Sequence, residues 1–294
     1  MIYSKKITTL IDVASKLSTD NHAVNKIMEM VNQLDSYEFE LLKLILESPD
    51  FPVAVEPSLI CDENIEEDKN DRAKAIIEIF LNANIENASF LDFGCGEGYV
   101  VKEAWEHGAD VAFGYDLLPH SWVSSCTMDF SIIKENSPYD IILAYDIIDH
   151  VTPPDFYIKQ MKDLLAPKGE IHARCHPWCS RHASHLYKCF NKAYAHLIFT
   201  EEELQNMGCF NKFTQRVIHP VNYYEKLFKG AGFHIKSRSI IRELIPPIIM
   251  NNKLIRNRII NHWAGSHEDK LRTGKKFPKD QLEQQFHDYV LIHA

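Results

Sequence analysis

The chain has 294 residues, of which 45% are hydrophobic and 25% charged, so it is long enough to bury a large core. Its formal net charge of −9 argues against a protein that coats nucleic acid along its whole surface, but it does not exclude a local basic groove. The seven cysteines, an odd number spread along the chain, make a poor disulfide framework and favour a reducing compartment.

The amino-terminal residues 1–18 mix lysines with apolar residues and contain no continuous apolar core of secretory length. No apolar run is long enough to cross a bilayer, because the stretch 244–250 is short and is broken by Pro246 and Pro247. We therefore expect a soluble, cytoplasmic protein that makes no use of a membrane.

Residues 1–84 are predicted to form a helical amino-terminal extension. Residues 1 to about 48 have helical spacing, and the acidic run 62–71 is expected to be a solvated loop. A second helix is predicted over 72–81, with Ile76, Ile77 and Phe80 facing inward. The apolar face of the first helix is predicted to comprise Leu34, Tyr37, Leu41, Leu44 and Ile45.

From Ser89 onward, strand and helix patterns alternate regularly. This alternation predicts βαβ units and a parallel sheet with helices on both faces. Thr152 is expected to cap the predicted helix 153–165, with Pro153 in its first turn. The predicted strands are 89–93, 111–115, 125–129, 139–145 and 169–175, and the predicted helices are 98–108 and 153–165.

After residue 176 the pattern changes. Residues 177–216 carry no clear strand and are predicted to be a first insertion. A helix near 221–230 and a strand over 233–240 resume the alternation, and a final strand begins at Asp288. The residues between these two strands, about 242–285, form a second predicted insertion within a domain spanning 85–294.

A glycine-rich turn follows the first predicted strand. Asp92 precedes Gly94, Cys95, Gly96 and Gly98, and a helix pattern begins directly afterwards. Glycine permits positive φ and lets a ligand approach the main chain, while the start of the helix offers unpaired N–H groups. The turn is therefore a candidate ligand-binding loop.

Polar and apolar residues also follow the next strands in the order that a nucleoside site requires. Asp116 lies about 20 residues beyond the glycine turn, a spacing at which an acid can accept hydrogen bonds from ribose hydroxyls, and Leu117 follows it. Asp129 and Phe130 follow the third predicted strand, and Tyr145 ends the fourth.

Together these residues resemble the cofactor site of class I S-adenosylmethionine (SAM) dependent methyltransferases. The segments Asp146-Ile-Ile-Asp-His150-Val-Thr-Pro and Leu164-Leu-Ala-Pro-Lys-Gly169-Glu are similar to the small-molecule, quinone-biosynthesis branch of that family. The resemblance implies an α/β, doubly wound, mostly parallel seven-stranded sheet with an antiparallel last strand. It also implies that Asp129 contacts the adenine amino group, that Phe130 lies against the ring, and that Tyr145 lies near the methionine part.

Two alternatives to a SAM site stay open. A nicotinamide or flavin dinucleotide site favours Gly-x-Gly-x-x-Gly, whereas this chain has Gly94-Cys-Gly96-Glu-Gly98 with Asp92 in front. An acid at that place suits a cationic ligand with an amino group better than a pyrophosphate. A doubly wound domain without a cofactor is the other alternative.

Acceptor-binding residues are expected after the fourth and fifth strands, since ligands in this fold lie beyond the carboxyl ends of the strands. His150 and His176 are candidate general bases, because imidazole titrates near working pH, and each is equally a candidate structural histidine. Arg174 is a candidate for binding an acidic acceptor group, or a partner for Asp146 or Asp149.

Cysteines and histidines cluster between 175 and 189. Cys179, His182 and either His185 or Cys189 are compatible with one helical face, which invites a zinc interpretation. No Cys-x-x-Cys pair occurs, so no metal ligands are assigned. A lid over the acceptor, rich in aromatic residues, is the preferred interpretation, and simple packing is the other.

The second insertion contains a basic group between residues 253 and 279. It is a candidate contact for an acidic partner such as a nucleotide or nucleic acid, and a solvated loop explains it equally well. The basic residues are Lys253, Arg256, Arg258, Lys270, Arg272, Lys275, Lys276 and Lys279.

A methyltransferase for a small-molecule O-, N- or C-acceptor is preferred over a nucleic-acid methyltransferase and over a SAM-binding partner protein without catalysis.

Overall fold

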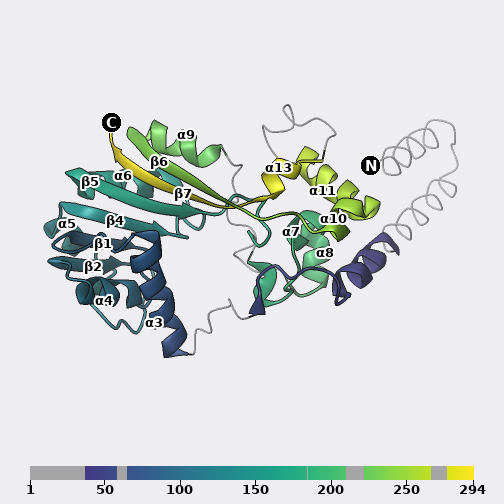
Figure 1. Cartoon of the computed structure of the whole chain (residues 1–294), viewed down its shortest axis with the longest axis horizontal. Helices are drawn as coiled ribbons and strands as arrows, with labels where there is room; N and C mark the ends of the chain where they lie inside the picture. The colour runs from purple at the N-terminus through teal and green to yellow at the C-terminus, as the bar shows by residue number, and fades with distance from the viewer. Residues whose placement is uncertain (1–36, 58–64, 184, 210–221, 266–276) are drawn as a thin grey trace, which may run out of the picture.

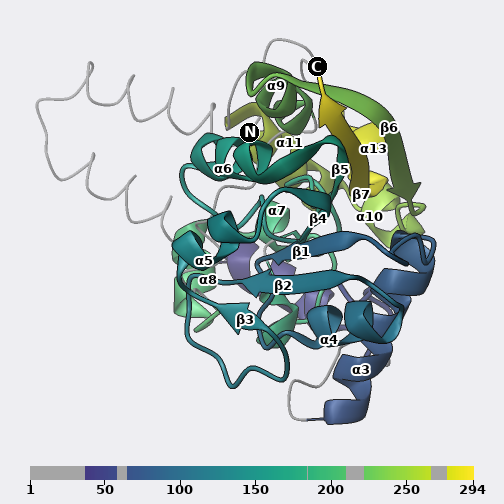
Figure 2. The same cartoon turned by 90° about the vertical axis from the view of Figure 1, so that its left-hand side faces the viewer.

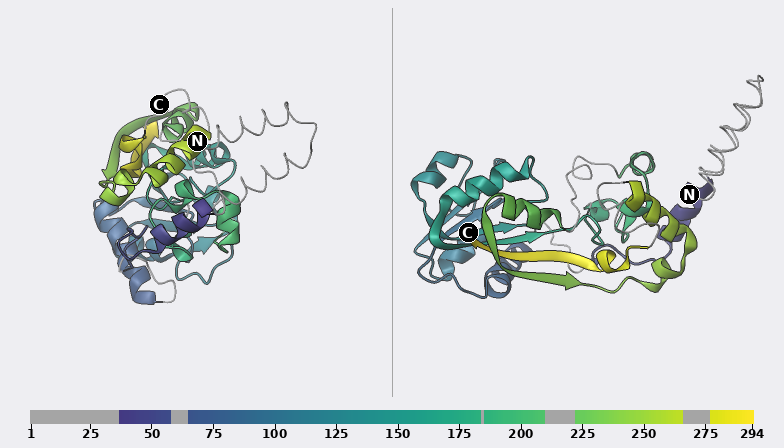
Figure 3. Two further views of the ribbon diagram at one scale, coloured as in Figure 1. Left: turned by 90° about the vertical axis from the view of Figure 1, so that its right-hand side faces the viewer. Right: turned by 90° about the horizontal axis from the view of Figure 1, so that it is seen from above.

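The computed structural model describes residues 37–57, 65–183, 185–209, 222–265 and 277–294, which form two lobes (Figure 1). One lobe is a sheet covered by helices, and the other is helical. Two long strands, β6 (Phe233–Arg242) and β7 (Gln284–His293), run from the sheet to the helical lobe, as Figure 3 also shows. None of the described helices has the length and apolar character needed to cross a bilayer.

The described strands form a seven-stranded sheet in the order β3-β2-β1-β4-β5-β7-β6. Strands β1 to β5 pair in parallel, and β7 runs antiparallel to both of its neighbours, β5 and β6. The predicted fold class is therefore confirmed. The first five strands are β1 (Ser89–Phe93), β2 (Val111–Tyr115), β3 (Cys126–Thr127), β4 (Tyr139–Tyr145) and β5 (Leu165–Cys175).

Strands β1, β2 and β4 have the predicted bounds, whereas the other four strands differ from the prediction; β6, for instance, ends at Arg242 rather than 240. Strand β3 is only two residues long, because Asp129 leaves the strand and caps α5 (Phe130–Glu135), a helix that the sequence analysis did not predict. Strand β5 begins at Leu165 rather than 169, and β7 begins at Gln284 rather than Asp288.

Both faces of the sheet are covered by helices, as Figure 2 shows. On β1, Phe90 points to the core shared with α4 (Tyr99–Glu106), while Leu91 points to the opposite core. That second core contains side chains of α5, α6 (Pro154–Leu164) and α9 (Tyr223–Gly230). Side chains that alternate along one strand thus pack into two cores, one on each face of the sheet, which is the doubly wound arrangement.

The helix before the sheet begins earlier than predicted. Helix α3 spans Glu66–Ala75 and continues as the π-helical segment η2 (Ile76–Phe80), whose Ile76 and Ile77 are buried as predicted. The expected loop is wrong over residues 66–71, where the acids occupy the first turns of α3. Carboxylates there interact favourably with the helix dipole. Residues 58–64 lie outside the described residues.

The predicted apolar face of the first helix is wrong for three of its residues and is confirmed only for Ile45, which is partly buried against the core. Within the described helix 37–47, Tyr37, Leu41 and Leu44 are exposed, whereas Leu42 and Leu46 are completely buried. They pack into a core formed with both insertions, whose positions a single-segment periodicity does not reveal. Leu34 and the rest of residues 1–36 lie outside the described residues.

The described part of 177–216 contains short helices joined by turns and no strand, as predicted, and the described part of the second insertion contains helices between the end of β6 at Arg242 and the start of β7 at Gln284. Thr200 and Glu203 form a capping box at the start of α8. Thr152 does not cap α6, since the helix is preceded by Pro153 and has no side-chain cap. The helices here are η3 (Leu186–Lys188), α7 (Ala195–Ile198), α8 (Glu201–Asn206), α10 (Pro247–Asn251), α11 (Lys253–Gly265) and α13 (Lys279–Leu282).

Candidate active site at the carboxyl ends of the strands

The glycine turn between β1 and α4 has the backbone conformation that its sequence predicts. Gly94, Gly96 and Gly98 have φ of 94°, 52° and 89°, all in the region that favours glycine. The backbone N–H groups of Gly94 and Cys95 donate to the carbonyl oxygen of Tyr115, at 2.7 and 3.1 Å. The turn is thereby attached to the end of β2.

Gly94 also makes a close approach to the loop after β4. A Cβ atom at this position would lie 2.6 Å from Cγ1 of Ile147, closer than real Cβ contacts come. Since Ile147 belongs to the segment that carries Asp146, Asp149 and His150, that segment packs directly against the glycine turn. The candidate cofactor loop and the candidate acceptor residues therefore form one site.

Asp92 lies under this turn and is only 4% exposed. Burial, followed by the negative charge of Asp116, raises the pKa of Asp92 to about 7, and Arg72 opposes this rise. Charging a carboxyl group in such a place is costly unless a cation is nearby. Asp92 is therefore suited to a ligand with a positively charged group.

Asp116 links the glycine turn to the segment that follows β2. Its Oδ2 accepts a hydrogen bond from the N–H of Gly96 at 2.9 Å, and its Oδ1 accepts one from Leu118 at 3.0 Å. Leu117 is 48% exposed beside it. Trp122, which the sequence analysis did not select, donates from its indole to the carbonyl oxygen of Gly96 at 3.1 Å.

Asp129 and Phe130 have structural partners of their own. The side chain of Asp129 caps α5 by accepting hydrogen bonds from the N–H and the hydroxyl of Ser131, and these bonds lower the pKa of Asp129. The ring of Phe130 lies 5.4 Å from that of Tyr115 and packs against the core. Their predicted contacts with adenine stay predictions.

Cys95 in the glycine turn lies beside Cys126 of β3. A Cβ atom on Gly114 would meet both sulfur atoms, at 2.7 and 2.6 Å, so the residue between them has no room for a side chain. A hydrogen bond with Cys126, together with burial, raises the pKa of the Cys95 thiol. Cys95 is therefore a packing residue of the turn and no thiolate nucleophile.

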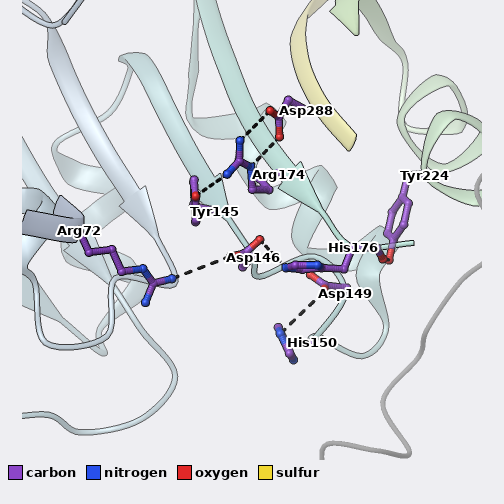
Figure 4. A network of polar contacts seen from close by, with 9 residues as sticks. All are labelled: Arg72, Tyr145, Asp146, Asp149, His150, Arg174, His176, Tyr224 and Asp288. Carbon is purple, nitrogen blue, oxygen red and sulfur yellow. Dashed lines mark hydrogen bonds and ion pairs between the residues drawn. The ribbon is translucent and has the colours of Figure 1, made fainter. Parts of the chain in front are cut away.

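Arg174 at the end of β5 makes a two-pronged contact with Asp288 of β7, shown in Figure 4, with N–O distances of 2.7 and 2.8 Å. Its remaining guanidinium nitrogen donates to the hydroxyl of Tyr145 at 2.6 Å. The guanidinium also lies over the rings of Phe80 and Phe286, at 4.9 and 4.8 Å. Arg174 thus holds β4, β5 and β7 together, and an acceptor-binding role stays a prediction.

Replacing Arg174 with methionine is expected to destabilise the protein by about 1–3 kcal/mol, because Asp288 loses its paired charge in a largely buried place. Urea unfolding measures this cost. The matched control is Arg238→Met on β6, whose pair with Glu225 is more exposed and is expected to contribute about 1 kcal/mol or less. Equal losses in the two variants would contradict the structural role of Arg174.

His176, Asp146 and Arg72 form a charged group beside the Arg174 contacts (Figure 4), in which His176 is buried, Asp146 is partly exposed and Arg72 is exposed. His176 Nε2 lies 3.1 Å from Asp146 Oδ1, and Arg72 of α3 lies 3.9 Å from Oδ2 of the same carboxylate. Burial lowers the pKa of His176, but Asp146 and Asp149 outweigh burial, so the pKa lies above its usual value. The charged imidazolium is favoured, and in that form it accepts no proton.

The pKa of Asp146 shows the same pairing. Burial raises it, but His176, Arg72 and Arg174 together outweigh burial, so the pKa lies below its usual value. Asp146 also has a φ of 55°, a strained value for a residue other than glycine. The chain therefore holds this carboxylate in place at a cost in backbone energy.

The cysteine and histidine cluster does not form the helical face suggested above. Residues 177–183 form turns, so Cys179, His182 and His185 do not share a helix. The thiol of Cys179 is buried and donates to the carbonyl oxygen of Gln281 at 3.1 Å. Burial, followed by the neighbouring His176 and His185, lowers the pKa of His182 to about 3.

Three described members of the basic group in the second insertion, Arg256, Arg258 and Lys279, have partners within the fold. Arg258 pairs with Glu38 and with Glu203 at 3.1 Å, and Lys279 lies 3.6 Å from Glu283. The guanidinium of Arg256 lies 5.2 Å from the ring centre of Phe277. Lys270, Arg272, Lys275 and Lys276 lie outside the described residues.

Arg72 and Asp288 were not among the predicted site residues, nor was Tyr224, whose hydroxyl donates to the carbonyl oxygen of His176 at 3.0 Å. A signal existed for Asp288 alone, because an antiparallel last strand beside β5 places an acid opposite Arg174 in one register. Arg72 and Tyr224 come from helices whose docking no sequence pattern indicates.

Curated relatives match parts of the chain. The ubiquinone biosynthesis O-methyltransferase of Pelagibacter ubique is 29% identical over 98 residues, covering 29% of this chain and 40% of its own length. The tRNA U34 carboxymethyltransferase of Idiomarina loihiensis is 27% identical over 99 residues, covering 28% and 30%. The chain thus spans about two fifths or less of the length of these relatives.

Solved structures with lower sequence identity also resemble parts of the chain. A SAM-dependent methyltransferase from Archaeoglobus fulgidus has a TM-score of 0.44 at 12% identity, covering 76% of this chain and 93% of that one. The PH0226 protein of Pyrococcus horikoshii has a TM-score of 0.44 at 15% identity, covering 82% and 97%. A family model described as a methyltransferase domain matches residues 65–237, more than half of the chain, and the chain therefore belongs to this methyltransferase family.

Proposed function

We propose that the protein is a SAM-dependent methyltransferase that acts on a small-molecule O-, N- or C-acceptor. The observation that carries this proposal is the pair of acids around the glycine turn. Asp92 is buried beneath the turn, and Asp116 accepts a hydrogen bond from the N–H of Gly96 in the turn. A cationic amino-acid group matches Asp92, and the second lone pair on each oxygen of Asp116 matches the ribose hydroxyls. The names of the relatives above support the same assignment.

SAM, when bound, supplies a methyl group on a sulfonium: the acceptor atom bonds to the methyl carbon while the carbon–sulfur bond breaks and its electron pair stays on sulfur. The chain contributes alignment of the acceptor and, for an oxygen or carbon acceptor, removal of a proton. His150 and His176 are the proposed groups near the acceptor. The charge pairing of His176 with Asp146 suits it to positioning, which leaves His150 as the better candidate for a base.

The proposed division of the chain keeps residues 1–84 as an extension and 85–294 as the methyltransferase domain with two insertions. The burial of Leu42 and Leu46 against both insertions supports a role for the extension in framing the acceptor side. A cytoplasmic location stays a prediction, and the described cysteines, none of which is in a disulfide, are compatible with it.

Two other functions are weaker candidates. A nucleic-acid or nucleotide acceptor would use the basic group of the second insertion, but its described arginines already pair with acids or rings of the fold. A steep loss of binding with salt would favour that acceptor. A SAM-binding protein without catalysis would bind SAM that carries a labelled methyl group but would transfer the label to no fraction of a cell extract.

The Asp116→Ala variant tests the assignment of the cofactor site. We expect its affinity for SAM to fall more than tenfold, because the ribose loses a charged hydrogen-bond acceptor. Calorimetry measures the affinity, and Asp116→Asn, which keeps one acceptor oxygen, should lose less. A dissociation constant for Asp116→Ala equal to that of the original protein would remove Asp116 from the site.

A further inference from the structure

Three side chains converge at the acceptor side of the candidate active site. Asp149 and His150 follow β4, and His185 comes from the first insertion, 35 residues further along the chain. One potential ligand atom from each lies within 4.8 Å of the other two. The Nε2 of His150 is 3.8 Å from Oδ2 of Asp149, and the rings of His150 and His185 lie 4.7 Å apart.

The carboxylate of Asp149 gives a second, independent sign of a ligand. Its side chain is only 6% exposed, and its Oδ1 is buried without a hydrogen-bond partner among the described residues. A buried carboxylate oxygen without a partner is rare in folded proteins, because its desolvation is not offset. A cation bound between the three side chains would offset that cost.

We propose that Asp149, His150 and His185 bind a divalent transition-metal ion of the Zn²⁺ or Mn²⁺ type. Two imidazole nitrogens and one carboxylate oxygen suit such ions, whereas Mg²⁺ prefers oxygen ligands. Ligand atoms in a bound site lie about 3–4 Å apart, so the group needs to close by only about 1 Å. Three protein ligands leave at least one coordination position open.

Two of the three proposed ligands, Asp149 and His150, belong to the segment that packs against the cofactor turn. Ile147, two residues before Asp149, packs against Gly94 and so joins the metal ligands to that turn. This inference rests on the proposed function, to which it adds the acceptor class: a hydroxyl-bearing small molecule whose oxygen binds the ion. The ion polarises the O–H bond, the proton passes to solvent water, and the oxygen retains the electron pair for attack.

His150 is then a metal ligand and no longer the general base named above. The ion takes over the lowering of the hydroxyl pKa, so the site needs no basic side chain at the reacting oxygen. His176 and Asp146 remain a charge pair next to these ligands, with the ring of His176 5.8 Å from that of His185.

The test measures metal content and affinity on the full-length protein, without an acceptor. The protein is stripped with a chelator and titrated separately with Zn²⁺, Mn²⁺ and Mg²⁺, using calorimetry and elemental analysis after desalting. We expect about one equivalent of Zn²⁺ or Mn²⁺ to bind and to raise the melting temperature, with Mg²⁺ much weaker.

Two ligand variants and one matched histidine variant make the test specific. Asp149→Asn preserves the shape of the side chain, and His185→Ala removes a ligand from the insertion; each should weaken metal binding at least tenfold. His234→Ala, on exposed β6 outside the group, should leave it unchanged. Circular dichroism confirms that each variant is folded.

The results separate this inference from the proposed function. If the stripped protein binds SAM but takes up no metal, or if both ligand variants bind metal like the original, the metal site is overturned and the methyltransferase proposal stands. If metal binds as expected and SAM does not bind, the metal site stands and the methyltransferase proposal falls.

Discussion

The Asp92→Asn variant is expected to be more stable than the original protein at pH 8 and to bind SAM more weakly. The pKa of Asp92 is raised from 3.8 to about 7 in the folded protein, so ionisation above pH 7 opposes folding. The difference of about 3 pKa units corresponds to at most about 4 kcal/mol at 1.36 kcal/mol per unit. Asparagine removes the charge and with it this cost.

The sign of the pH dependence follows from the raised pKa. The folded state keeps the proton on Asp92 up to about pH 7, whereas the unfolded chain releases it near pH 4. The contribution to stability is therefore fully present below about pH 4 and is lost as the pH rises to about 7. Urea unfolding between pH 5 and pH 8 should show a shallower loss for Asp92→Asn than for the original protein.

SAM affinity provides the second readout of this variant. A charged hydrogen bond contributes about 1.5–3 kcal/mol, so calorimetry should show a loss of about 10- to 100-fold in affinity. Asp163→Asn, an exposed carboxylate on α6, is the control and should change neither property. A lower stability of Asp92→Asn at pH 8, together with unchanged SAM affinity, would show that Asp92 is a structural residue.

The Gly94→Ala variant is expected to lose about 2–4 kcal/mol of stability and most of its SAM affinity. A φ of 94° is unfavourable for alanine, and its Cβ would meet Cγ1 of Ile147 at 2.6 Å. Relief of the overlap moves either the turn or the loop after β4, and both belong to the candidate site. Urea unfolding and calorimetry with SAM measure the two effects.

Gly208→Ala separates backbone strain from the overlap. Gly208 has a φ of 69° and open space around the Cβ position, so its variant should show the backbone cost alone, about 1 kcal/mol. Ile147→Ala combined with Gly94→Ala should recover part of the loss, giving a coupling of about 1 kcal/mol. Additive losses in the double variant would mean that the two residues do not touch.

The contrast between the central strands and the first helix shows where sequence patterns are reliable. Residues 89–93 and 139–145 are predicted to the residue, because a central strand is recognised from a short, mostly apolar run within the segment itself. The face of helix 37–47 is predicted wrongly, because Leu42 and Leu46 pack against insertions more than 130 residues away. Periodicity identifies a helix, but the side it buries depends on the partner.

The site shows the same limit for charged residues. Arg174 was a candidate for an acceptor contact or for Asp146 and Asp149, yet its partner is Asp288, which faces it across the β5–β7 pair. The pairing required the register of two strands separated by more than 100 residues. Asp129 was similarly placed at the end of β3, but its competing role as a helix cap depended on α5.

The sequence alone determined the order of the strands along the chain, the glycine turn and the acids at the ends of β1 and β2, because each depends on residues within one turn or strand. The tertiary structure decided which acid each cation meets, how deeply Asp92 is buried, and that Asp149, His150 and His185 converge. These depend on the docking of distant segments, and a pattern of local spacing contains no information about the distance between two such segments.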